Sequence, residues 1–197
     1  MANDQLTIAS DTPTSLDVDA TTISGRELGG AISYSELEAL RLELSNSPDL
    51  VTVTDTGAPL TIQARDGADD VQISDVSHTT SVELGTDTDG DQVRIADAGA
   101  AITVMGDRRA IDRVDVDLSA LQAAMNATIE DSMLADTYAI DGATTGKISV
   151  TAVTNLALRL GHGNDTTVLD TAKNDSSMGP GSDSDDQSSN PPTELFV

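Results

Sequence analysis

Aspartate is the residue whose spacing points most clearly to chemistry in this sequence. The segment Asp87-Thr-Asp89-Gly-Asp91 places three carboxylates within five residues, and its glycine permits a sharp bend. Calcium binds several oxygen ligands at roughly 2.3–2.6 Å, so this segment is the strongest single candidate for a calcium site. It is not an EF-hand loop, because Ala98 stands where that loop has its final glutamate.

A second set of aspartates, Asp55, Asp75 and Asp97, recurs at one place in successive repeats of an apolar pattern. If the repeats stack, these carboxylates lie about 5 Å apart and repel one another unless something compensates. Backbone N–H groups in Asx-type turns are one compensation, and a calcium ion is the other. Both hypotheses stay open at the level of sequence.

Residues suited to catalysis are few. Arg108-Arg109 with Asp112 and Arg113 is the densest basic cluster; it could bind an acidic sugar or simply be solvated loop charge. The two histidines, His78 and His162, have no arrangement of serine or cysteine partners that would suggest a nucleophilic triad. We therefore predict no enzymatic activity and no catalytic residues.

The elements that position these side chains follow from a pattern repeated over residues 42–97. Each unit holds two short apolar-polar-apolar segments, such as Leu60-x-Ile62 and Val71-x-Ile73, with starts 18, 22 and 20 residues apart. Alternation at period two predicts strands with one buried face, and a fixed period of this length predicts stacked units. The predicted inward columns are Leu42, Leu60, Val82 and Ile102; Leu44, Ile62, Leu84 and Val104; Val51, Val71, Val93 and Val114; Val53, Ile73, Ile95 and Val116.

The expected fold class is all-β: a right-handed parallel β-helix, or β-solenoid, with rungs of roughly 18–22 residues. Ser119 with Gln122 fits a capping box, so we expect one inserted helix near 118–134. The expected parts are N-terminal irregular rungs or a cap over 1–30, the solenoid over 31–173, and a flexible acidic tail over 174–197. Residues 32–44 also match residues 148–160 at an offset of 116, which suggests the start of a second copy of a long module.

Composition limits the partners. The chain has 197 residues and a formal net charge of −24, which disfavours nucleic acid and anionic membrane surfaces. There is no cysteine, and no apolar run approaches the length that crosses a membrane. The first residues show no basic segment followed by an apolar one, so we do not expect a cleavable secretion signal.

The segment from Tyr34 to Leu44, followed by Asp49-Leu-Val-Thr-Val53, resembles repeats of very large secreted proteins of aquatic bacteria. Gly161-His-Gly163-Asn-Asp165 resembles the core of the calcium-binding nonapeptide of repeats-in-toxin proteins. The resemblance covers roughly 32–116 and 140–170. It implies calcium binding at Asp165 and export from the cell, and the C-terminal Glu194-Leu-Phe-Val197 is similar to the uncleaved export signal of that family.

The function we expect is that of an extracellular or cell-surface structural protein, a self-assembling subunit of a fibre, surface layer or matrix. Its partners would be copies of itself, joined through the coil ends and the C-terminal tail, and Ca²⁺ is the candidate cofactor. Two alternatives remain: a polysaccharide-active lyase, epimerase or hydrolase on the same fold, and a calcium-folded adhesin module.

Overall fold

The structure is a computed structural model, and it describes residues 4–107, 110–121, 126–132, 137–142, 144–160 and 166–171. This part of the chain is all-β, apart from the single 3-10 turn η1 (Arg26–Leu28). The strands are β1 (Gln5–Ala9), β2 (Ser15–Val18), β3 (Thr22–Gly25), β4 (Ile32–Ser33), β5 (Ala39–Glu43), β6 (Leu50–Val53), β7 (Leu60–Gln63), β8 (Asp70–Ile73), β9 (Thr80–Glu83), β10 (Gln92–Ile95), β11 (Ile102–Met105), β12 (Arg113–Asp117), β13 (Asn126–Ser132), β14 (Thr137–Asp141), β15 (Ile148–Thr151), β16 (Asn155–Arg159) and β17 (Thr166–Thr171).

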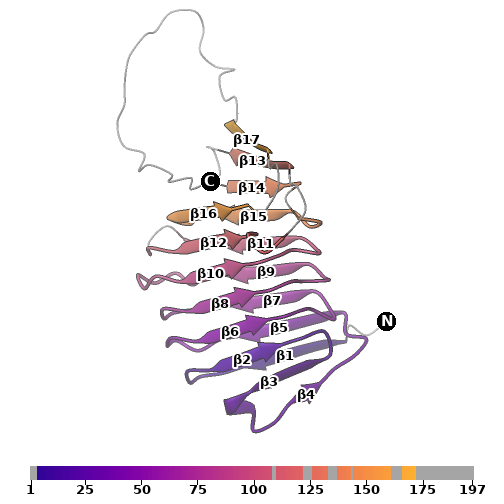
Figure 1. The fold of residues 1–197 in the computed structure, drawn as a ribbon. Coiled ribbons are helices and arrows are strands. Elements are labelled where there is room, and N and C mark those ends of the chain that lie inside the picture. The colour runs from indigo at the N-terminus through magenta and orange to yellow at the C-terminus, as the bar shows by residue number, and fades with distance from the viewer. Residues whose placement is uncertain are drawn as a thin grey trace, which may run out of the picture.

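The strands form two sheets. Among the described residues, sheet A has nine strands in the order β1-β5-β7-β9-β11-β15-β14-β13-β17, and sheet B has eight in the order β16-β12-β10-β8-β6-β2-β3-β4. Between β5 and β12 the chain alternates between the sheets, and each strand pairs in parallel with the strand two places later (Figure 1). We call one sheet A strand and the sheet B strand that follows it a rung.

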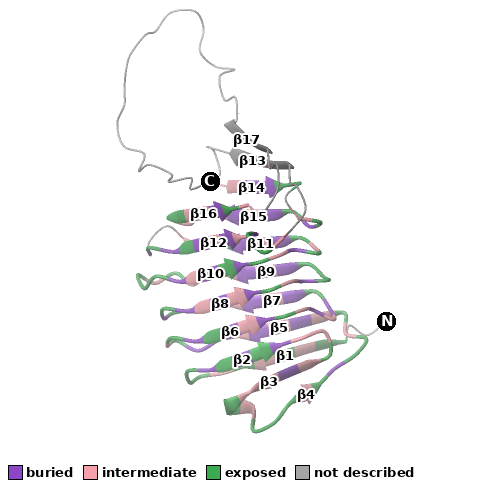
Figure 2. Ribbon diagram, viewed as in Figure 1, coloured by how far each residue is buried: buried purple, intermediate pink, exposed green. Residues whose placement is uncertain are grey.

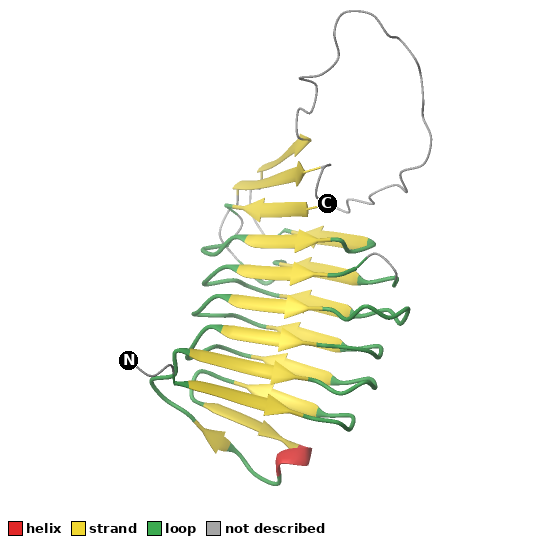
Figure 3. Ribbon diagram, turned by 180° about the vertical axis from the view of Figure 1, so that it is seen from behind, coloured by secondary structure: helices red, strands yellow, loops and turns green. Residues whose placement is uncertain are grey.

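Both sheets are mixed, because antiparallel strands lie at the two ends of the stack. At the N-terminal end β3 pairs antiparallel with β2, and β4 pairs antiparallel with β3. At the C-terminal end β14 pairs antiparallel with both β15 and β13. Figure 3 shows these strands above and below the regular rungs. The repeated pattern had predicted parallel strands alone, so these antiparallel pairs are additions to the expected fold.

The predicted stacking in sheet B is confirmed. Val71 lies across from Val51 on one side and from Val93 on the other, in parallel strands, and Val93 lies across from Val114. The neighbouring column of Val53, Ile73, Ile95 and Val116 follows the same register.

In sheet A both predicted columns are wrong by one pleat at each step, since Ile102 also lies across from Thr80 and Val104 across from Val82. Leu42 and Val82 both lie across from Ile62, whereas Leu60 lies across from Leu40 and Thr80. A shift of two residues keeps every side chain on the same face, so alternation alone could not fix this register. The true register was also difficult to recognise from the sequence, because Thr80, which occupies a buried position in the column, is polar.

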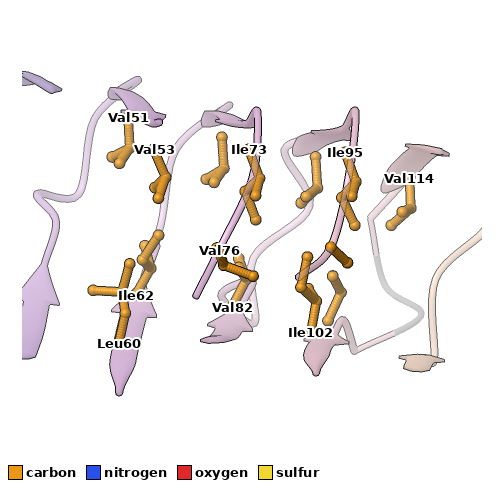
Figure 4. Close-up of a cluster of buried hydrophobic side chains, with 14 of the residues drawn as sticks. Val51, Val53, Leu60, Ile62, Ile73, Val76, Val82, Ile95, Ile102 and Val114 are labelled. Atoms are coloured by element: carbon orange, nitrogen blue, oxygen red, sulfur yellow. The ribbon is translucent and has the colours of Figure 1, made fainter. Parts of the chain in front are cut away.

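The two sheets pack their inward side chains against each other. Val51, Ile62, Val71, Val82 and Val93 have no exposed surface. Figure 4 shows the sheet B valines and isoleucines pointing toward Leu60, Ile62, Val82 and Ile102 of sheet A. β-Branched residues suit this pleated interior, which runs the length of the stack as a narrow apolar core (Figure 2).

The helix predicted near 118–134 is wrong. Residues 126–132 form β13, which pairs with β14 on one side and β17 on the other. An open sheet edge offers a full row of backbone hydrogen bonds, and here it overrides the helical spacing of apolar residues from Leu121 to Ile129.

The 116-residue match does not mark equivalent structural units. Residues 39–43 form β5 in sheet A, whereas their counterparts 155–159 form β16 in sheet B. Within the predicted 1–30 segment, β1 and β2 already form a rung in register with β5 and β6, and only β3 and β4 depart from that pattern. The predicted tail over 174–197 lies outside the described residues. In the part that is described, no helix has the length and hydropathy needed to cross a membrane.

Candidate functional site: the aspartate ladder and the sheet edges

A column of four aspartates lies where the chain enters sheet B. Asp49, Asp69, Asp91 and Asp112 each stand two residues before the first inward valine of β6, β8, β10 and β12. All four are buried, with exposed fractions of 4%, 2%, 3% and 2%. We call these four residues the aspartate ladder.

Each step of the ladder joins two rungs through a side chain. The Asp49 N–H donates to Asp69 Oδ1 at 2.8 Å, the Asp69 N–H donates to Asp91 Oδ1 at 2.8 Å, and the Asp91 N–H donates to Asp112 Oδ1 at 3.3 Å. Each carboxylate therefore accepts a backbone N–H from the rung before it, at the residue directly preceding the sheet B strand. The hydrogen bonding between rungs is extended by one residue in this way, so no buried N–H is left without an acceptor at these steps.

The N-terminal end of the ladder is closed by hydroxyl residues. The Thr14 hydroxyl donates to Asp49 Oδ1 at 2.9 Å, and the Thr14 N–H also donates to that oxygen. The Ser45 N–H and hydroxyl donate to Asp49 Oδ2 at 2.8 and 2.9 Å. Asp49 is thus fully hydrogen-bonded at both carboxylate oxygens.

Asp69 is different. Its Oδ2 atom is buried and has no hydrogen-bond partner. Burial, together with the nearby charges of Asp91, Asp49 and Asp87, raises the pKa of Asp69 to about 8, although the hydrogen bond from the Asp49 N–H acts to lower it. Loss of hydration disfavours the charged form of a carboxyl group, so this side chain binds a proton more readily than an ordinary aspartate.

The pKa values of the two later ladder residues, Asp91 and Asp112, are raised for the same reason. Burial, together with the charge of Asp112, raises the pKa of Asp91 to about 7. Burial also raises the pKa of Asp112, with further contributions from Asp107 and Asp87. Asp69, Asp91 and Asp112 are therefore weakly acidic carboxyl groups inside a highly acidic protein.

The predicted calcium segment does not form one cluster of three carboxylates. Asp91 turns inward into the ladder, Asp89 is exposed, and Asp87 lies between them in exposure. Asp87 Oδ2 accepts the Gly67 N–H of the rung before at 2.6 Å, and its Oδ1 accepts the Asp89 N–H at 2.9 Å. Gly67 has a φ of 117°, and a Cβ there would lie 2.6 Å from the Ser47 carbonyl carbon, so only glycine fits.

Asp55, Asp75 and Asp97 do recur at one corner. Asp55 Oδ1 accepts the N–H groups of Thr56 at 2.7 Å and of Ser77 in the next rung at 3.0 Å. Asp75 Oδ1 is bonded in the same way, to its own neighbour at 2.7 Å and to the next rung at 2.9 Å. Although burial acts to raise it, hydrogen bonds from Ser77 and Thr56 hold the pKa of Asp55 below its usual value. This geometry favours the turn hypothesis for the corner.

Calcium at these residues stays a prediction. Asp165 lies outside the described residues. Within the residues that are described, no group of three or more histidine, cysteine, aspartate or glutamate side chains is arranged to hold a metal ion.

The basic cluster is divided in the structure. Asp112 points into the ladder, while Arg113 is exposed and pairs with Asp115 at 2.7 Å. Arg108 and Arg109 lie outside the described residues. His78 Nδ1 lies 2.8 Å from the Thr56 carbonyl oxygen, a contact that joins two rungs. The described residues Asp112, Arg113 and His78 do not lie together in one site. His162 lies outside the described residues.

The ladder was not predicted from the sequence, although the sequence carries a signal for it. All four members fit Asp-x-Val, and the spacing repeats with the sheet B register. The same position holds Thr14 in the first rung and Thr154 in the last. A polar residue repeated directly before a buried strand could have been recognised as a buried hydrogen-bonding column.

The stack also ends in open strand edges. Among the described residues, β1 ends sheet A and β4 ends sheet B at the N-terminal end, while β17 and β16 end them at the C-terminal end. Leu6 and Ile8 of β1, and Leu156 of β16, are only partly buried, although the equivalent positions inside the stack are almost fully buried. Unpaired edges beside half-exposed aliphatic side chains are a template for a further strand.

No protein-family model, no curated protein and no solved structure matches this chain.

Proposed function

We propose that this chain is a structural protein of the cell exterior that assembles with copies of itself, and that its fold is a right-handed parallel β-solenoid. The parallel pairing of like strands from β5 to β12 supports the solenoid. Crossovers between parallel strands are right-handed in nearly all proteins, which supports the hand of the coil.

The observation that carries the proposal is the state of the two ends. Within the described residues each end offers two strand edges, and the aliphatic columns stop there at partly buried side chains, Leu6 and Ile8 at one end and Leu156 at the other. Pairing an edge with a strand of another copy would satisfy backbone groups and bury these side chains. A contact between unlike ends extends without closing, so the product would be a fibre or a lattice.

The high negative charge fits an environment with abundant salt. At a formal charge of −24, copies repel one another unless ions screen the charge. The exterior location also follows the resemblance to secreted repeat proteins. We expect no catalysis, because Arg113, the arginine of the basic cluster that the structure describes, forms an ion pair with Asp115.

A calcium-folded module is the second candidate, and one observation favours it. The buried Asp69 Oδ2 lacks a partner, and Asp87 and Asp91 are near enough to disfavour its charge. A calcium ion beside these carboxylates would remove the repulsion and supply folding free energy.

Light scattering and electron microscopy of the full chain, with millimolar calcium and with a chelator, test both candidates. The proposal predicts high-order species at about 0.15 M salt, and deletion of 174–197 should reduce them. A protein that stays monomeric at high concentration under every condition would refute self-assembly. A chain that is fully folded in chelator, by circular dichroism, would refute calcium-dependent folding but leave assembly standing.

A further inference from the structure

At each end of the stack one sheet extends further than the other: sheet A at the C-terminal end and sheet B at the N-terminal end. The sheets share six rungs, from β1 with β2 to β15 with β16. Beyond the last shared rung, sheet A carries three more strands, β14, β13 and β17, and sheet B carries none in the described residues. Beyond the first shared rung, sheet B carries two more strands, β3 and β4, and sheet A carries no further strand in the part of the chain that is described (Figure 1).

The outermost strands run in the direction of the rungs. β17 is parallel to β13, and two antiparallel pairings separate β13 from β15, so β17 has the direction of β15 and of β11. Two antiparallel pairings likewise separate β4 from β2. A second copy placed on the same axis would therefore meet the first with parallel strands in both sheets.

We infer that successive copies stack coaxially, with β1 of one copy against β17 of the copy before it. This inference rests on the self-assembly proposed above and names its geometry. The extra sheet A strands of one copy, β14, β13 and β17, then lie opposite the extra sheet B strands of the next copy, β3 and β4. Half-exposed Leu6 and Ile8 of β1 are covered in the process.

The strand count then leaves one vacancy. With β1 next to β17, sheet A is continuous, but sheet B lacks one strand between β16 and β4 of the following copy. The vacancy borders the half-exposed Leu156 of β16. We assign it to the C-terminal segment, since 26 residues follow the end of β17 at Thr171.

The last residues of the chain suit a buried strand. Leu195 and Val197 are two positions apart, so in an extended chain they lie on one face and Phe196 on the other. That spacing matches Leu156 and Leu158, the inward residues of β16. Glu194 would stand at the start of the strand.

The axial repeat of the assembly tests the stacking. Nine strand levels in sheet A at about 4.8 Å each give a repeat of about 43 Å along the axis. Averaged electron micrographs or fibre diffraction of the full chain, assembled at about 0.15 M salt, should show this spacing. An assembly with a clearly different repeat would overturn the stacking but leave the proposed function intact. Failure of the full chain to assemble at all would overturn both.

The terminal segment is tested by a pair of matched variants. Leu195→Asp with Val197→Asp should raise the concentration needed for assembly at least about tenfold, because both side chains enter the core. The control Phe196→Ser changes the opposite face of the same strand and should assemble like the unaltered chain. Equal assembly by the double variant and the unaltered chain would overturn the assignment. An equal loss in both variants would also overturn it, because only one face is proposed to be buried.

Discussion

Raising the pH from 5 to 8 should weaken the fold, because Asp69 and Asp91 of the aspartate ladder hold a proton more tightly when folded than when unfolded. The pKa of Asp69 is raised to about 8 and that of Asp91 to about 7. A raised pKa in the folded state gives stability that is complete below the unfolded pKa of about 3.9 and is lost as the pH rises through the folded value. The direction is opposite to that of a salt-bridged aspartate.

The size of the effect follows from linkage. A group that is protonated in the folded chain and ionised in the unfolded chain changes the free energy of unfolding by about 1.4 kcal/mol per pH unit. Asp69 alone therefore removes about 3 kcal/mol between pH 5 and pH 7. That is a large share of the 5–15 kcal/mol that stabilises a typical domain.

Urea unfolding followed by circular dichroism at pH 5, 6, 7, 8 and 9, at constant ionic strength, measures this slope. Asp69→Asn keeps an oxygen for the Asp49 N–H and cannot ionise, so the variant should lose much of the slope. Asp70→Asn is the matched control: Asp70 pairs with Arg94 on the surface, and its removal should leave the slope unchanged. A stability that is flat or rising from pH 5 to 8, or an Asp69→Asn slope equal to that of the unaltered chain, would refute the reasoning.

Calcium enters the same experiment as a separate arm. If the ion binds at Asp69, millimolar calcium should restore stability at pH 8 in the unaltered chain but not in Asp69→Asn. Equal effects of calcium on both proteins would place the ion elsewhere.

The other predictions concern packing and surface charge. Leu42→Ala should lower the free energy of unfolding by about 2–5 kcal/mol in urea titrations, because Leu42 is fully buried, and a loss below 1 kcal/mol would count against the core. Gly85→Ala should prevent normal folding by circular dichroism, because a Cβ would lie 1.3 Å from the Arg65 carbonyl oxygen; Gly30→Ala, with open space around it, should fold normally. Arg94→Ala should cost less than about 1 kcal/mol, since its ion pair is on the surface; a larger loss in the same titration would show that the pair is structural.

The sequence predicted the part of the fold that repeats. Valines at one position in four units gave the sheet B register correctly, because Val51, Val71, Val93 and Val114 have no competing apolar residue two places before them. The register of sheet A was harder to predict. Leu40, Leu42 and Leu44 all alternate onto the inward face, so the sequence offers three apolar positions where only two pair with Leu60 and Ile62. Only the three-dimensional pairing with Leu60 and Ile62 decides between them.

The ends could not be predicted in the same way. β13 and β14 do not belong to the repeat, and their pairing depends on the edge that β15 presents. Local spacing favoured a helix there, but an edge strand gains backbone hydrogen bonds that no local pattern records. The ladder escaped notice for a related reason: an aspartate before a strand is usually assigned to a turn, and its burial depends on neighbouring rungs.

Neighbouring rungs in parallel register are the feature on which the ladder, the stepped ends and the proposed assembly all depend. The chain has no cysteine, so an engineered pair reports distance without interference. Gln72 and Arg94 lie directly across from each other on the outer face of sheet B. Gln72→Cys with Arg94→Cys should form an intramolecular disulfide under mild oxidation, whereas Gln72→Cys with Thr61→Cys, on the opposite sheet, should not. Failure of the first pair to close, or equal closure of both pairs, would contradict the stacked arrangement.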